Sequence, residues 1–127
     1  DIVPDGYRAV WQKLLEKGLP VVAIRDNPWM PGRVADCVAR NPENLPLCGL
    51  DRAKALATQS PTAPLEGTPN LAFVDLSDYF CTPDFCPAVS DGVVMYSDNN
   101  HMTGQFAERL SSPLEQALMK IVPKIRQ

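Results

Sequence analysis

The chain has 127 residues, of which 45% are hydrophobic, so it can form one domain with a substantial core, and this composition argues against disorder. No apolar run approaches the roughly 18 residues that a membrane-spanning helix requires. The formal net charge is -3 and the Lys and Arg residues are scattered, which argues against nucleic acid as a partner. We expect a single domain over residues 1–127.

The first half of the sequence predicts a helix, a strand and a long loop. In "PDGYRAVWQKLLEKGLP" the apolar residues recur at helical spacing, with Asp5 placed to cap the start and Gly18 placed to end the helix. "LPVVAIRDNP" follows as a short apolar run, which predicts a strand buried on both faces, as in a parallel sheet. Residues 28–48 are rich in proline and predict an irregular loop.

The second half predicts two further extended segments and a C-terminal helix. "GLDRAKALAT" favours a short helix near Asp51, "NLAFVDLSDYF" a second buried strand, and "GVVMYSD" a third, shorter extended piece. The last helix should open at Thr103 and kink or restart near Ser112. This alternation predicts an open α/β sheet, in which functional residues gather at the carboxyl ends of the strands. Asp26, Asp75 and Asp98 follow the three strands in turn.

The four cysteines form two pairs that are close in the sequence. Four cysteines allow three connectivities, but the short spacings favour Cys37–Cys48 and Cys81–Cys86. A zinc site is the alternative; its ligands are usually about two to four residues apart with histidine available, and here the one histidine is distant. Disulfides need an oxidising compartment. Since no signal peptide is present, we expect a mature or excised portion of an exported protein.

His101 is the only histidine, and Asp98 stands three residues before it. An Asp-x-x-His step in a loop before a helix lets the carboxylate accept the ring N–H and fix the tautomer, as in a catalytic base with its orienting acid. The alternative is that His101 caps or packs at the start of the helix. The spacing alone does not decide between these roles.

Four segments, taken in order, resemble a known family. "VVAIRDNP", "DCVARNPENLPLC", "FVDLSDYFCTPDFC" and "YSDNNHMT" are similar to the C-terminal half of the SGNH hydrolase-like domain fused to bacterial acyltransferase-3 membrane proteins. The resemblance runs from about Leu19 to Leu118. It implies a flavodoxin-like α/β fold, a three-layer αβα sandwich with a mainly parallel sheet, present here only as its C-terminal portion. It also implies that His101 is the catalytic base and Asp98 its orienter.

The resemblance also implies residues that this chain lacks. SGNH enzymes carry their nucleophilic serine in a Gly-Asp-Ser motif, and neither that motif nor Gly-x-Asn-Asp occurs here. The serines present lie in predicted loops or caps, away from any strand-to-helix elbow; they are Ser60, Ser77, Ser90, Ser97, Ser111 and Ser112. We therefore expect the nucleophile in a missing N-terminal segment of the same domain. Asn27 is a weak candidate for binding an oxyanion, the alternative being an ordinary turn residue before Pro28.

The function that the resemblance implies is O-acyl transfer or ester hydrolysis of short, acetyl-like groups on cell-envelope glycans, with no metal or organic cofactor. The expected partners are a membrane acyltransferase domain in the full-length protein and a glycan acceptor, at the extracytoplasmic face of the bacterial envelope. Two alternatives stay open. One is a non-catalytic binding or assembly module that keeps the SGNH fold. The other is a small disulfide-held structural domain in which His101 is incidental.

Overall fold

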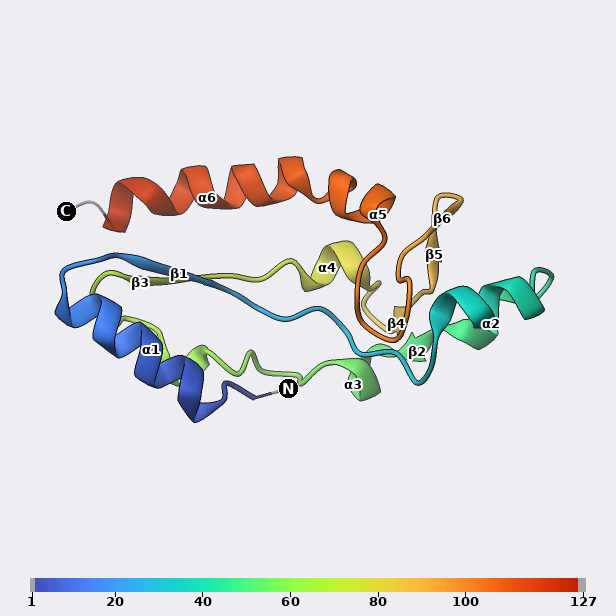
Figure 1. Cartoon of the computed structure of the whole chain (residues 1–127), viewed down its shortest axis with the longest axis horizontal. Coiled ribbons are helices and arrows are strands. Elements are labelled where there is room, and N and C mark those ends of the chain that lie inside the picture. The colour runs from blue at the N-terminus through green and yellow to red at the C-terminus, as the bar shows by residue number, and fades with distance from the viewer. Residues whose placement is uncertain (1, 126–127) are drawn as a thin grey trace.

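The computed structural model describes residues 2–125 of the chain. Helices and short strands alternate along an elongated molecule (Figure 1). The elements are α1 (Asp5–Glu16), β1 (Val21–Ile24), α2 (Val34–Arg40), η1 (Leu45–Cys48), β2 (Leu50–Asp51), α3 (Arg52–Ala55), η2 (Ala63–Leu65), β3 (Leu71–Val74), α4 (Ser77–Phe80), β4 (Phe85–Cys86), β5 (Val89–Ser90), β6 (Val93–Val94), α5 (Gly104–Arg109) and α6 (Ser111–Ile125).

A two-stranded parallel sheet, β1 with β3, lies between α1 and α6 (Figure 1). The register pairs Val21 with Leu71 and runs in step to the ends of both strands. On one face Trp11 of α1 packs edge-on against Phe73, with ring centroids 6.2 Å apart. On the other face α6 packs against β3 over the main hydrophobic core. The two predicted strands and the α/β class are thus confirmed, with a helix on each face of the sheet. Of β3, only Val74 is buried and the other three residues are half-buried.

The edge of β1 that faces away from β3 has no paired strand in the described part of the chain. The N–H groups of Val21 and Arg25 donate to carbonyl oxygens on the β3 side. Because successive N–H groups along a strand point to opposite edges, those of Val22 and Ile24 point to the open edge. Ile24 is 52% exposed. The prediction that this strand is buried on both faces is therefore wrong: Val21 and Ala23 are buried on one face, whereas on the other face Val22 is half-buried and Ile24 is exposed.

The helix predicted at the start of the chain is confirmed, and Gly18 ends it, as predicted. Gly18 has a φ of +73°, a left-handed conformation that only glycine adopts without steric cost. The N–H of Gly18 donates to Leu15 O and that of Leu19 to Leu14 O, which closes the helix end. The cap at the start is Pro4, and Asp5 is the first residue of α1.

The prediction of an irregular loop over residues 28–48 was wrong. This stretch contains α2 and the 3₁₀ turn η1, and the Cys37–Cys48 disulfide joins them. The prolines that suggested a loop lie outside α2 or in the first turn of η1, where a missing N–H costs little: Pro28 and Pro31 precede α2, Pro42 lies between α2 and η1, and Pro46 is in η1. Val34, the first residue of α2, is 1% exposed and anchors the helix in the core. Cys81–Cys86 is the second disulfide, so both predicted pairings are confirmed.

The third extended piece lies outside the parallel sheet. β6 pairs antiparallel with β5 in a hairpin, whereas the sequence suggested a further parallel strand. The two-residue turn between them is Asp91-Gly92, and both residues have positive φ. This is the backbone that tight hairpins require, and Asp-Gly is one of its strongest sequence signals.

The C-terminal helix restarts, as one of the two predicted outcomes had it. Thr103 Oγ1 accepts a hydrogen bond from the N–H of Phe106 at 3.2 Å and so caps α5. The chain then breaks at Leu110 and continues as α6. Phe106 packs against Phe80, which in turn stacks on Tyr96, and these rings form the centre of the core directly beneath the Asp98–His101 turn.

Candidate active site

Asp98 and His101 form a hydrogen-bonded pair in the turn between β6 and α5. Asp98 Oδ2 lies 2.7 Å from His101 Nδ1, as the Asp-x-x-His spacing predicted. The other carboxylate oxygen, Oδ1, accepts the backbone N–H groups of Asn100 at 2.9 Å and of His101 at 2.8 Å. One carboxylate therefore folds the turn and orients the ring at the same time.

The same hydrogen bonds keep Asp98 ionised. The N–H groups of Asn100 and His101, followed by the His101 ring, lower the pKa of Asp98 from 3.8 to about 2. An ionised carboxylate accepts a hydrogen bond from the Nδ1–H group, so the neutral imidazole presents its lone pair at Nε2. The pair thus has the electronic arrangement of a general base with its orienting acid.

The backbone that follows β1 holds this turn in place. Residues 27–34 donate three hydrogen bonds to carbonyl oxygens of the turn: Asn27 Nδ2 to Asn100 O (2.7 Å), Met30 N to Asn99 O (2.7 Å) and Val34 N to Asp98 O (3.0 Å). Because Met30 and Val34 are buried, their backbone positions are fixed by packing. The turn is consequently attached to the rigid core and not only to its own helix.

The second ring nitrogen of His101 faces outwards. The side chain is 76% exposed, and no hydrogen bond within residues 2–125 reaches Nε2. No serine hydroxyl of the described chain contacts the ring; the nearest in sequence, Ser97 Oγ, donates to the carbonyl oxygen of His101 at 3.1 Å. The base is therefore open to a group that comes from outside the described residues.

A comparison with family models decides the relationship that these features suggest. The model described as "SGNH domain (fused to AT3 domains)" matches residues 2–116. The chain belongs to this family. Comparisons with curated proteins and with solved structures found no match.

In this SGNH domain, Asn27 lies next to the Asp98–His101 turn. Its side-chain nitrogen donates to Asn100 O at 2.7 Å and, less favourably, to Pro28 O at 3.3 Å. Both amide hydrogens thus have acceptors within the protein, and an oxyanion would have to compete with them. The geometry assigns Asn27 first to supporting the turn.

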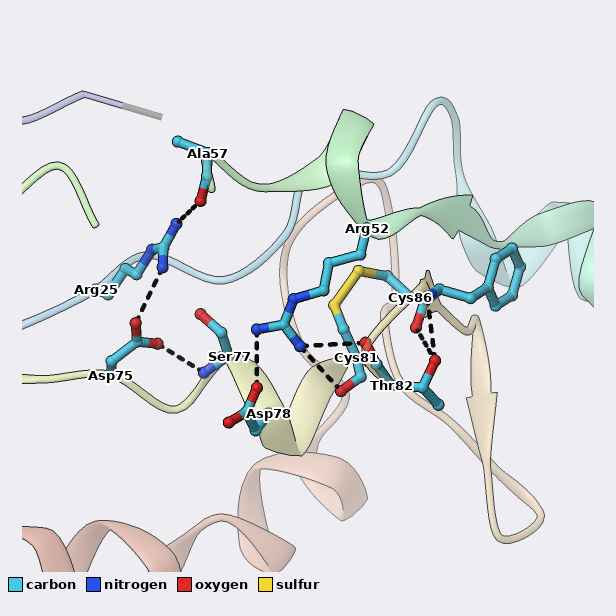
Figure 2. A network of polar contacts seen from close by, with 10 residues as sticks. Arg25, Arg52, Ala57, Asp75, Ser77, Asp78, Cys81, Thr82 and Cys86 are labelled. Atoms are coloured by element: carbon cyan, nitrogen blue, oxygen red, sulfur yellow. Dashed lines mark hydrogen bonds and ion pairs between the residues drawn. A yellow bond between two sulfur atoms is a disulfide. The ribbon is translucent and has the colours of Figure 1, made fainter. Parts of the chain in front are cut away.

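A second polar cluster joins the carboxyl ends of β1 and β3 (Figure 2). Arg25, with only 6% of its side chain exposed, forms an ion pair with Asp75 at 2.9 Å and donates to Ala57 O. Partial burial acts to raise the pKa of Asp75, but the hydrogen bonds from Ser77 and Arg25 have the larger effect in the opposite direction. The pKa of Asp75 therefore lies below its usual value. Sequence reasoning placed Asp75 at this edge but missed Arg25 as its partner, although an arginine that ends an apolar strand is itself a signal.

Asp78, three residues after Asp75, is directed towards α3 (Figure 2). It forms an ion pair with Arg52 at 2.8 Å, and Arg52 also donates to the carbonyl oxygens of Cys81 and Thr82 (Figure 2). These contacts fix the disulfide loop of the SGNH domain against α3. Asp75 and Asp78 are thus occupied in holding the ends of elements together.

Two mainly apolar grooves border the end of β1. One, of about 530 Å³, is lined by side chains of α4, α5 and α6 and by Met102, next to His101. The other, of about 400 Å³, lies on the α1 side. Ile24, Arg25 and Asp26 line both grooves, so the open edge of β1 stands between them.

Two further features, a metal-binding cluster and a membrane-spanning helix, are absent from the described residues. No group of three or more His, Cys, Asp or Glu side chains is placed to hold a metal ion within residues 2–125. Over the same range, no helix combines the length and the apolar character needed to cross a membrane.

Proposed function

We propose that this chain is the part of an SGNH-type O-acyltransferase or esterase domain that carries the general base, His101, and its orienting acid, Asp98. The observation that carries the proposal is the 2.7 Å contact between Asp98 Oδ2 and His101 Nδ1 on a turn that leaves the opposite side of the ring exposed. A histidine that only caps or packs would use both nitrogens or turn into the core, and this ring does neither.

The proposed reaction proceeds through an acyl-enzyme. A serine hydroxyl gives its proton to His101 Nε2 as its oxygen attacks the acyl carbonyl, and Asp98 stabilises the imidazolium that forms. His101 returns the proton to the leaving alcohol. In the second half, His101 takes a proton from water or from an acceptor hydroxyl, whose oxygen forms the new bond to the acyl carbon as the serine leaves.

We place the nucleophilic serine in a segment N-terminal to these residues, within the same domain. The open edge of β1 supports this placement, because a strand added there in parallel would end at the same rim as Asp26. The apolar grooves on either side of that edge offer surfaces for the elements that connect such strands. With them the sheet would become the three-layer αβα sandwich of which residues 1–127 form the C-terminal part.

The proposed substrates follow from the family. Its fusion to AT3 domains supports a membrane acyltransferase domain as the donor of a short acyl group, with a cell-envelope glycan hydroxyl as acceptor. The two disulfides support an oxidising, extracytoplasmic location. The proposed chemistry proceeds on protein side chains, without a metal or organic cofactor.

The experiment that tests this function is steady-state kinetics on the natural polypeptide with its upstream segment, using p-nitrophenyl acetate. We expect His101→Ala to lower kcat by about 10³–10⁴-fold. Because the ring is 76% exposed, the free energy of unfolding should barely change. Ser97→Ala is the control and should keep most of the activity, since its hydroxyl contacts only a backbone carbonyl.

The second candidate function is a non-catalytic binding or assembly module. It is favoured by the lack of any serine hydroxyl against the His101 ring in the part of the chain that the structure describes. Full activity of the His101→Ala variant, or no turnover by the natural polypeptide with an intact Gly-Asp-Ser segment, would support this candidate over the enzyme.

A further inference from the structure

Trp29 is an exposed aromatic residue on a rigid piece of backbone beside the catalytic turn. Its neighbours Pro28 and Met30 are both buried, whereas Trp29 is 56% exposed. The N–H of Met30 donates to Asn99 O at 2.7 Å, so this backbone is bonded to the turn that holds Asp98 and His101. The indole is therefore presented next to the proposed base by residues that packing fixes.

The indole is also held in orientation by a hydrogen bond. Its Nε1–H donates to Asp26 Oδ2 at 3.0 Å, and Asp26 Oδ1 accepts the N–H of Asn27 at 3.0 Å. The one polar atom of the ring thus has a partner, and what remains exposed is apolar ring surface. A ring fixed in this way loses little entropy when a ligand stacks on it.

The turn that is bonded to this backbone carries two uncommitted amides, those of Asn99 and Asn100. None of the hydrogen bonds formed by residues 2–125 involves the side-chain amide of Asn99 or Asn100, although both residues are only half-buried. Each amide offers two donors and one acceptor. The charged groups fixed in this region are the carboxylates of Asp26 and Asp98, which favour a neutral ligand over an anionic one.

We propose that Trp29, with the amides of Asn99 and Asn100, forms the acceptor subsite of the enzyme and binds one pyranose ring of a neutral saccharide. This inference rests on the proposed function. A pyranose has an apolar C–H face that stacks on an aromatic ring and a rim of hydroxyls that amides recognise. Because residues on either side of Trp29 are bonded to the Asp98–His101 turn, a sugar stacked on the indole would lie near that turn.

The subsite acts in the second half of the reaction. The sugar hydroxyl transfers its proton to His101 Nε2, its oxygen bonds to the acyl carbon, and the bond from that carbon to the serine oxygen breaks. The proton then passes from His101 to the serine, so the enzyme is regenerated. Trp29 is a specificity-determining residue in this step: it positions the acceptor and takes no part in proton transfer.

Binding can be tested on the chain itself, because its two tryptophans give two indole N–H signals in a ¹H–¹⁵N spectrum. We expect titration with chitotetraose or maltotetraose to shift the Trp29 signal saturably. Trp11, which packs against Phe73 and Tyr7, is the internal control and should not move. The absence of a saturable Trp29 shift with both saccharides at 20 mM would overturn the proposal, as would equal shifts of both signals.

Kinetics on the natural polypeptide separate this inference from the proposed function. Trp29→Ala should raise the KM for the saccharide acceptor at least about tenfold with little change in kcat, and Trp29→Phe should restore most acceptor binding. Tyr79→Ala is the matched control, since Tyr79 is 53% exposed but lines a different groove. If acyl transfer is robust and Trp29→Ala behaves like wild type, the subsite is wrong and the function stands. If saccharide shifts Trp29 but no acyl transfer occurs, the proposed function is wrong, and Trp29 is a saccharide-binding site without the role of acceptor subsite.

Discussion

Replacing Asn27 by alanine removes the side-chain donors that attach the end of β1 to the Asp98–His101 turn. The bond to Asn100 O is short, at 2.7 Å, and joins residues 73 positions apart, whereas the bond to Pro28 O is 3.3 Å long and local. We count only the first as stabilising. A neutral hydrogen bond contributes about 0.5–1.5 kcal/mol net, so Asn27→Ala should destabilise the chain by about 1 kcal/mol. For a domain of this size, that lowers Tm by about 3–4 °C.

Asn27→Asp sharpens the test, because it keeps the shape but replaces donors with a charged acceptor facing two carbonyl oxygens. We expect a loss of about 2–3 kcal/mol for this variant at neutral pH. Urea denaturation followed by circular dichroism measures both variants. An unfolding free energy of Asn27→Ala within about 0.3 kcal/mol of wild type would refute the supporting role.

The same variants distinguish support of the turn from oxyanion binding. Loss of an oxyanion donor lowers kcat about 10²–10³-fold and need not affect stability. Asn41→Ala is the matched control: its amide donates to Cys37 O at 2.9 Å within the end of α2, so it should cost similar stability and leave ester hydrolysis intact. If Asn27→Ala lowers kcat a hundredfold without destabilising the chain, Asn27 binds the oxyanion.

Three further outcomes are expected of the chain. Tyr96→Phe should be neutral or stabilise by up to about 1–2 kcal/mol in urea denaturation, because the buried Tyr96 hydroxyl has no hydrogen-bond partner within residues 2–125; a clear loss of stability would mean that it has one. Removing the Cys37–Cys48 disulfide, which spans 11 positions, should cost about 3 kcal/mol by loop-closure entropy, and an unchanged denaturation midpoint would contradict this. The pKa of Asp98 falls from 3.8 to about 2, so its stabilisation is complete above pH 4 and lost as the pH falls towards 2. Asp98→Asn should therefore show a smaller loss of stability than wild type over that interval, and equal losses would rule out the ionised carboxylate as the cause.

The sequence predicts those elements whose signals are local. The apolar spacing of α1 and its end at Gly18 are contained in one stretch, as is the Thr103 cap of α5. β1 and β3 are short apolar runs with clear ends, so their existence and parallel class follow from pattern alone.

The errors in the prediction come from signals that compete or that depend on distant residues. Proline content obscures α2, because the prolines lie on either side of the helix and the buried Val34 that anchors it has partners elsewhere in the chain. The α/β rhythm places the third extended piece beside the other two strands, whereas the Asp91-Gly92 turn folds it onto β5 as a hairpin.

The contacts of the candidate site are likewise either local in the sequence or formed between distant residues. Asp98 and His101 are three residues apart, and their contact follows from spacing. Arg25 and Asp75 lie 50 positions apart and Asn27 and Asn100 73 apart, and such contacts exist only after β1 has paired with β3 and the turn has packed beside them. The motif therefore indicates the proposed base and its orienter, and only the fold identifies what holds them.

The proposed role of His101 as a general base is tested most directly by mapping the serine that it is proposed to activate. The natural polypeptide is treated with a fluorophosphonate, which labels activated serines, and the adduct is located by peptide mass spectrometry. We expect a single adduct on a serine N-terminal to Asp1 and no adduct on the 127-residue chain alone. This labelling should be abolished in His101→Ala and strongly reduced in Asp98→Asn. An adduct on Ser97 or on another serine of this chain, or labelling that persists without His101, would contradict the proposed role.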